Sequence, residues 1–104
     1  MSFELRIYHA NPGKIDALLT RFRDHTVALF AKHNMESLGY WVSDSEPNDL
    51  LYILKHSGEA ANNWQEFLAD PEWIEVKANS EVAGGLVASI EAKFLSATDF
   101  SKIK

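Results

Sequence analysis

The chain has 104 residues, a formal net charge of −5 and no cysteine. This length fits one domain, and the lack of cysteine excludes disulfides and thiolate metal sites. Ten Lys and Arg residues are scattered among fifteen acids, which argues against a nucleic-acid-binding face. Because we find no signal peptide and no apolar run of the roughly 18 residues that a membrane span needs, we expect a cytoplasmic protein without a membrane or nucleic-acid partner.

Residues 3–9 alternate between apolar and polar side chains and predict a first strand. The apolar side chains fall on one face, which needs a cover of helices; they are Phe3, Leu5 and Ile7. The opposite face suits either solvent or the lining of a polar pocket; it carries Glu4, Arg6 and Tyr8.

A long amphipathic helix is predicted next, with Asn11 as its N-cap, Pro12 at its first position and an apolar stripe as far as His33. Asn34 suits a left-handed cap. The charged residues that we place outside the stripe are Lys14, Asp16, Arg21, Arg23, Asp24 and Lys32.

Two strands at residues 38–43 and 50–56 form a hairpin around a loop rich in turn-forming residues. Ser57 can cap a second helix, and Asp70 with Pro71 ends that helix and begins a shorter one. We assign Trp64 and Trp73 to the core because they lie at helical spacing with other apolar residues. The last strand is expected at residues 86–95, within a single domain at residues 1–100 followed by a tail at 101–104.

The element order β-α-β-β-α-β predicts an α+β, ferredoxin-like fold. Right-handed crossovers then give a four-stranded antiparallel sheet of order 4-1-3-2, with the helices on one face. The strands nevertheless carry large residues on both faces, as in Tyr40-Trp41 and in residues 51–54. We therefore predict a homodimer whose two sheets pack face to face as a barrel, with Glu4, Arg6 and Tyr8 inside or beside it.

Several segments resemble the NIPSNAP family between residue 3 and about residue 100. They are the opening Phe-Glu-Leu-Arg-Ile-Tyr, Pro12-Gly13-Lys14 at the start of the long helix, Gly39-Tyr40-Trp41, and Asp70-Pro71-Glu72-Trp73. The resemblance implies a dimeric α/β barrel, a fold also used by cofactor-independent monooxygenases, haem-handling proteins and stress-response proteins. Eukaryotic members are associated with mitochondria, vesicles or mitophagy, whereas this chain looks like a short bacterial-type member with one repeat unit and no targeting segment.

The row on the first strand is the first candidate for a ligand site. Arg6 could clamp a carboxylate or phenolate in bidentate fashion, and Tyr8, with Glu4 beside it, could donate a hydrogen bond. The alternative is a cross-strand ion pair that fixes the strand register, joining Glu4 or Glu91 to Arg6 or Lys93. Trp41 and Tyr52, with Tyr40, could wall an aromatic pocket or fill the dimer core.

His9 and His56 each end a predicted strand, and we expect both near one mouth of the barrel. There a histidine could serve as a catalytic general base, although a solvated strand end is the alternative. The histidine spacing gives no metal motif, and the glycines give no nucleotide signature, so we expect no metal and no cofactor.

Three functions fit these features. The first is a small-molecule enzyme, such as a cofactor-independent oxygenase with Arg6 and Tyr8 orienting the substrate. The second is a non-catalytic binder of a small aromatic or apolar molecule in the same barrel pocket. The third is a structural or interaction protein whose barrel is filled by its own side chains. We rank small-molecule binding or turnover first.

Overall fold

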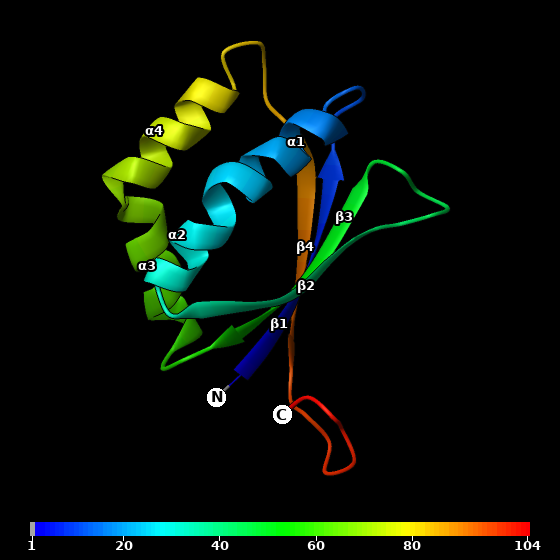
Figure 1. Cartoon of the computed structure of the whole chain (residues 1–104), viewed down its shortest axis with the longest axis vertical. Helices are drawn as coiled ribbons and strands as arrows, with labels where there is room; N and C mark the ends of the chain where they lie inside the picture. Colours follow the sequence, from blue (N-terminus) through cyan, green and yellow to red (C-terminus); the bar gives the residue numbers. More distant parts are fainter. Residues whose placement is uncertain (1) are drawn as a thin grey trace.

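The computed structural model describes residues 2–104 and consists of a sheet with helices packed on one side (Figure 1). The strands are β1 (Ser2–Ala10), β2 (Met35–Val42), β3 (Asp49–His56) and β4 (Val87–Leu95). The helical segments are α1 (Ile15–Arg21), the π-helical turn η1 (Phe22–Thr26), α2 (Val27–Lys32), α3 (Ala60–Ala69) and α4 (Pro71–Ser80).

The four strands form one antiparallel sheet in the order β2-β3-β1-β4. This is the predicted order 4-1-3-2 seen from the other edge, so the α+β ferredoxin-like arrangement is confirmed. β1 is central, and its Arg6 lies opposite Tyr52 of β3 and Ala92 of β4. The shortest dimension of the molecule is 20 Å, which matches one helix layer on one sheet.

The long helix begins later than predicted, at Ile15 instead of Pro12. Gly13 has φ +77°, a left-handed conformation that cannot continue a right-handed helix. Asn11 acts elsewhere, because its side-chain amide donates to the carbonyl of Gly85 at 2.9 Å. The predicted left-handed residue at the far end is confirmed, since Asn34 has φ +64°.

The junction between the two later helices follows the prediction. The Asp70 carboxylate accepts a hydrogen bond from the backbone N–H of Glu72 at 2.9 Å, and Pro71 occupies the first turn of α4. The start of α3 differs, because Gly58 at φ +75° separates Ser57 from the helix and Glu59 takes the N-cap position.

The two faces of β1 are the reverse of the prediction. The helices cover the face with Glu4 and Tyr8, which are 1% and 7% exposed, whereas Leu5 and Ile7 lie half-buried on the other face. The cause is β3, which contributes to the helix-covered face the residues Leu50, Tyr52, Leu54 and His56, all at most 1% exposed. Cross-strand neighbours point to the same side, so the parity of β3 decides the orientation of β1.

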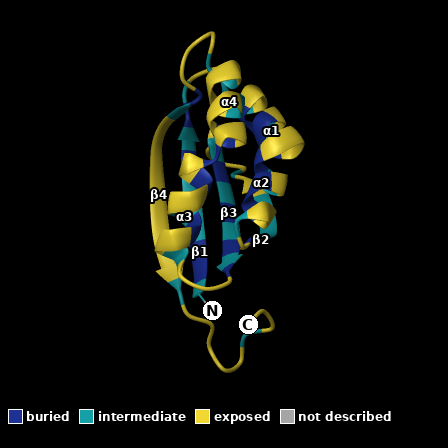
Figure 2. Ribbon diagram, turned by 90° about the vertical axis from the view of Figure 1, so that its left-hand side faces the viewer, coloured by how far each residue is buried: buried dark blue, intermediate teal, exposed yellow. Residues whose placement is uncertain are grey.

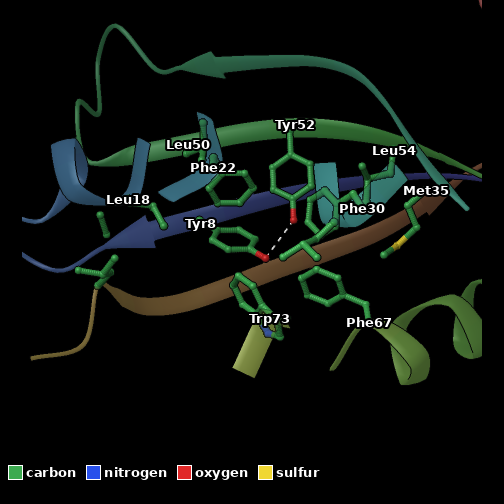
Figure 3. Packing of buried hydrophobic residues seen from close by; sticks show 13 residues of the cluster. Tyr8, Leu18, Phe22, Phe30, Met35, Leu50, Tyr52, Leu54, Phe67 and Trp73 are labelled. Atoms are coloured by element: carbon green, nitrogen blue, oxygen red, sulfur yellow. Dashed lines mark hydrogen bonds between the residues drawn. The ribbon is translucent and has the colours of Figure 1, made fainter. Parts of the chain in front are cut away.

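An aromatic cluster fills the space between the helices and the sheet (Figure 3). The ring of Phe22 lies 5.5 Å from Tyr8 and 5.3 Å from Tyr52, and Phe30 lies 5.0 Å from Phe67, measured between centroids. Rings at these distances and inclined angles give favourable edge and tilted contacts. The core of the protein is therefore on the side of Tyr8.

The face of the sheet opposite the helices, here called the open face, has no helical cover within residues 2–104 (Figure 1). Its side chains are apolar but only partly buried; they include Leu5, Ile7, Trp41, Leu51 and Ile53. Beyond Leu95 the chain leaves the sheet and loops back beside one end of this face, where the backbone of Lys104 accepts from Lys55 at 3.0 Å.

β4 is an edge strand that the helices leave largely uncovered (Figure 2). Ile90 and Phe94 point to the helix side of the sheet yet are 47% and 59% exposed. No helix of residues 2–104 combines the length and hydrophobicity needed to span a bilayer.

Candidate functional site

A cleft of about 410 Å³ lies on the helix side of the sheet, where α3 and α4 stand above β1 and the uncovered part of β4. Its walls are mostly aromatic and aliphatic, and its polar groups are mainly cationic. The side chains on which its chemistry depends are Arg6, Tyr8, Arg21, Trp64, Trp73 and Lys77.

Arg6 is fixed in position at this cleft. Its Nε donates to Glu4 Oε2 at 2.8 Å, and its Nη1 donates to the Tyr8 hydroxyl at 3.4 Å. The guanidinium carbon lies 3.8 Å from the centre of the Trp64 ring, a cation–π distance. The charge of Arg6 is thus held at the floor of the cleft by contacts on three sides.

Glu4 anchors this arrangement from behind the cleft. Its carboxylate also accepts from Trp64 Nε1 and His56 Nε2, each at 2.8 Å. Burial by itself would raise the pKa of Glu4, but the hydrogen bonds from Arg6, Trp64 and His56 outweigh it and lower the pKa below its ordinary value. Glu4 is therefore ionised at neutral pH and holds both Arg6 and Trp64.

Tyr8 presents a hydroxyl to the cleft. The Tyr52 hydroxyl donates to it at 2.9 Å (Figure 3), and Arg6 also donates to it. Because the Tyr8 oxygen receives these two hydrogen bonds, its own proton is oriented elsewhere, and no acceptor for it occurs within residues 2–104. Burial raises the pKa of Tyr52 well above its ordinary value, so Tyr52 stays a donor.

Arg21 reaches the cleft from α1 beneath α4. It is 5% exposed, its guanidinium carbon lies 5.1 Å from the Trp73 ring, and Nη1 donates to Ser80 Oγ at 3.2 Å. Its Nε has no hydrogen-bond partner in residues 2–104. The carboxylate of Glu81 is 3.9 Å away, and burial lowers the pKa of Arg21. The prediction that Arg21 falls outside the buried stripe of the helix is wrong.

The cleft brings together only part of the predicted ligand row. Arg6 and Tyr8 line it, while Glu4 and Tyr52 lie one hydrogen bond behind them. Trp41 is on the open face, 54% exposed, with its ring over Gly39, so the sheet separates it from Arg6. The row consequently faces the helices of its own chain and not the interior of a barrel between two sheets.

The two histidines do not meet at one mouth, as the sequence had suggested. His9 pairs with Asp49 at one end of the β1–β3 ladder, and His56 pairs with Ser2 at the other. His56 is fully buried, with Nε2 bonded to Glu4 and Nδ1 accepting from Asn63 at 3.1 Å. Neither histidine lines the cleft.

His9 has a different environment from His56. Its ring lies between the carboxylates of Glu91 and Asp49, at 2.5 and 2.7 Å. Hydrogen bonds to Glu91 and Asp49 raise the pKa of His9 above its ordinary value. These contacts tie β1 to both of its neighbouring strands, which is a structural role.

Of the six side chains on which the chemistry of the cleft depends, four were not in the predicted site: Arg21, Trp64, Trp73 and Lys77. Helical spacing correctly predicted that Trp73 lies in the core, where it is 7% exposed. The same spacing does not show that a core tryptophan also lines a cleft. Arg21 gave no usable signal, because a charged residue beside the apolar stripe of a helix is ordinarily solvated.

Two further hollows are larger than this cleft, and the first of them shares Arg21 with it. A groove of about 600 Å³ runs between α1, η1 and α4 and is lined by acidic residues, among them Asp24, Glu72 and Glu75. An apolar hollow of about 450 Å³ lies between the open face and the C-terminal residues, and it includes Phe3, Trp41 and Ile103. The first contains none of the predicted site residues, and the second contains only Trp41.

Comparison with known proteins identifies relatives of the chain. The NIPSNAP family model matches residues 3–102. Among solved structures, Atu4242 from Agrobacterium tumefaciens is 26% identical with a TM-score of 0.85 over 100% of both chains. A NIPSNAP family protein of the same organism, Atu5224, is 25% identical with a TM-score of 0.84 over 99% of this chain and 98% of that chain.

A more distant likeness concerns the fold alone. A structure described as an antibiotic biosynthesis monooxygenase is 14% identical, with a TM-score of 0.65 over 94% of this chain and 99% of that chain. Among curated proteins no match to the chain was found. Since the family match spans nearly the whole sequence and similar structures carry the same name, the chain belongs to the NIPSNAP family.

Proposed function

We propose that the protein is a homodimer that binds a small aromatic or apolar molecule in the cleft between α3, α4 and the sheet. The observation that carries the proposal is the position of Arg6 and Tyr8, two directed polar groups in a cleft walled by Trp64 and Trp73. A volume of about 410 Å³ falls in the range of small-molecule sites, and a few fixed polar groups among apolar walls are typical of them.

The open face supports the homodimer. Leu5, Ile7 and Ile53 lie side by side on paired strands and are only half-buried. Two sheets pack well at about 10 Å when apolar side chains of both interdigitate, and a second copy offers the matching surface. In such a dimer each cleft lies on the outer, helix-covered side of its own sheet.

Binding fits the site better than turnover by a histidine base, because His9 and His56 lie outside the cleft. The likeness to a monooxygenase concerns the fold and assigns no reaction. A structural protein with a self-filled interior is the second candidate, and the aromatic cluster around Phe22 and Tyr52 favours it.

Tryptophan fluorescence can test the binding proposal. Trp64 and Trp73 line the cleft, whereas Trp41 lies across the sheet, so the variant Trp41→Phe keeps only the two cleft reporters. We expect saturable changes in the emission of this variant on titration with 3-phenylpropanoate or 3-phenylpropanamide. A flat response to both compounds would reject the cleft as a small-molecule site.

Native mass spectrometry of freshly purified protein tests the assembly. We expect the mass of two chains, and a defined additional mass would reveal a retained molecule. A monomer at micromolar concentration would reject the homodimer and with it the argument from the open face.

A further inference from the structure

The cleft has an excess of positive charge in an acidic protein. The groups at or directly behind it are three cations, Arg6, Arg21 and Lys77, and two carboxylates, Glu4 and Glu81. The excess is one positive charge, whereas the whole chain has a formal net charge of −5. The local charge of the cleft is therefore opposite in sign to that of the whole chain, which favours an anionic ligand over a cationic one.

Arg21 is the cation with the least compensation. Arg6 has a direct carboxylate partner at 2.8 Å, but the distance from Arg21 Nη1 to Glu81 is 3.9 Å. The Glu81 carboxylate is itself bonded to Lys77 at 2.8 Å, so its charge is shared. Arg21 is only 5% exposed, and within residues 2–104 its Nε has no hydrogen-bond partner. A buried cation with so few partners is unfavourable unless an anion approaches it.

Tyr8 adds a directed hydrogen-bond donor to these charges. Its oxygen already accepts from Tyr52 and from Arg6, which leaves its own proton to be donated toward the cleft. Both arginines line the same cleft as Tyr8. The cleft thus offers hydrogen-bond donors and positive charge to a ligand, and the Tyr8 oxygen does not act as an acceptor toward that ligand.

We infer that the molecule bound in the cleft is a small monocarboxylic acid with an aromatic or apolar body, held as its anion between Arg6 and Arg21 with Tyr8 donating to it. This inference rests on the proposed binding function. The planar carboxylate matches the donor fork of a guanidinium. The walls formed by Trp64, Trp73 and Ile90 accommodate the apolar body.

The charge balance favours a monoanion over a phosphate ester. One carboxylate neutralises the single positive charge in excess, whereas a phosphate dianion would leave the cleft negative. The cleft also offers few polar groups besides these cations, while a phosphate group needs several donors for its three terminal oxygens.

The test compares two ligands of nearly equal shape, 3-phenylpropanoate and 3-phenylpropanamide. Each is titrated into the full chain, and isothermal titration calorimetry measures its affinity. We expect the acid to bind about tenfold more tightly, or better, because a charge-assisted hydrogen bond is stronger than a neutral one. Equal affinities would overturn the inference and leave the proposed function intact. If neither compound binds, both fail.

Variants locate the anion. Arg6→Gln and Arg21→Gln should each lower the affinity for the acid to about that of the amide, with little change for the amide. Arg23→Gln is the matched control, since Arg23 is exposed on the neighbouring turn and lies outside the cleft. A preference for the acid that survives both arginine substitutions in folded protein would overturn the inference.

A second test measures ligand affinity at increasing salt concentration. It uses the unmodified protein, so it does not depend on whether a variant folds. Rising ionic strength should weaken binding of the acid while leaving the amide unchanged, because salt screens only the charged pair. Equal salt dependence of the two ligands would count against a charged contact and overturn the inference.

Discussion

The two faces of the single sheet differ in a way that runs against simple expectation. The helix-covered face buries Glu4 and His56 and half-buries Arg6, whereas the open face leaves Leu5 and Ile53 half-exposed. The polar groups tolerate burial because each has a partner within hydrogen-bonding distance. The apolar side chains of the open face cannot be compensated by hydrogen bonds, and only packing against another protein surface can bury them.

The largest effect is expected from a charge introduced on the open face. In the proposed dimer, Ile53→Asp would bury an uncompensated carboxylate in each copy. Each such carboxylate should destabilise the dimer by about 3–5 kcal/mol. We expect native mass spectrometry to show the dimer of the unmodified protein and a folded monomer of the variant.

Val82→Asp is the control, because Val82 is 86% exposed in the loop after α4 and does not lie on the sheet. A dimer that survives Ile53→Asp would show that the open face is not the interface.

The next largest effect is expected from a substitution on the helix-covered face. Glu4→Gln removes the charge on which Arg6, His56 and Trp64 converge, so the free energy of unfolding should fall by about 3 kcal/mol or more in urea denaturation. Glu36→Gln, an exposed position on β2, should change it by less than about 0.5 kcal/mol. Similar small losses for both variants would mean that the buried network contributes little to stability.

A smaller effect separates the two tyrosines. Tyr8→Phe leaves the buried Tyr52 hydroxyl without its acceptor, at about 1–3 kcal/mol in unfolding free energy. Tyr52→Phe removes only a donor, and because Tyr8 still accepts from Arg6, we expect about 1 kcal/mol. Equal losses in the two variants would contradict the direction of the hydrogen bond.

The smallest effect concerns pH. Because Glu91 and Asp49 raise the pKa of His9 above its ordinary value of 6.5, the contribution of His9 to stability is fully present below pH 6.5 and is lost as pH rises through the raised pKa. Melting temperatures recorded across neutral and mildly alkaline pH should show a shallow decline that disappears in His9→Gln. A decline of the same size in that variant would assign it to another group.

Much of the fold followed from local patterns. Alternation in residues 3–9, helical spacing after Asn11, and the Asp70-Pro71 cap each report on neighbouring residues, and the structure contains the corresponding elements. The start of α1 was misjudged because a single backbone angle, φ +77° at Gly13, delays the helix. The strand order then follows from element order and crossover handedness.

The site was less accessible to sequence reasoning. Arg6 and Tyr8 stood out because they share a face of one strand, and the cleft does contain both. The other contributors, Arg21, Trp64 and Trp73, lie on three helices that meet only in the folded chain. The expectation that the histidines meet was wrong because β1 and β3 are antiparallel neighbours, so the C-terminal ends of the two strands, which carry His9 and His56, lie at opposite ends of the sheet.

By itself the sequence determined the elements, their order and the two-sided character of the strands, because these depend on short-range periodicity and turn residues. Tertiary structure alone decided which face of β1 became the interior. A period of two defines two faces but does not choose between them. That choice came from the register with β3, whose largest side chains turned Glu4, Arg6 and Tyr8 toward the helices.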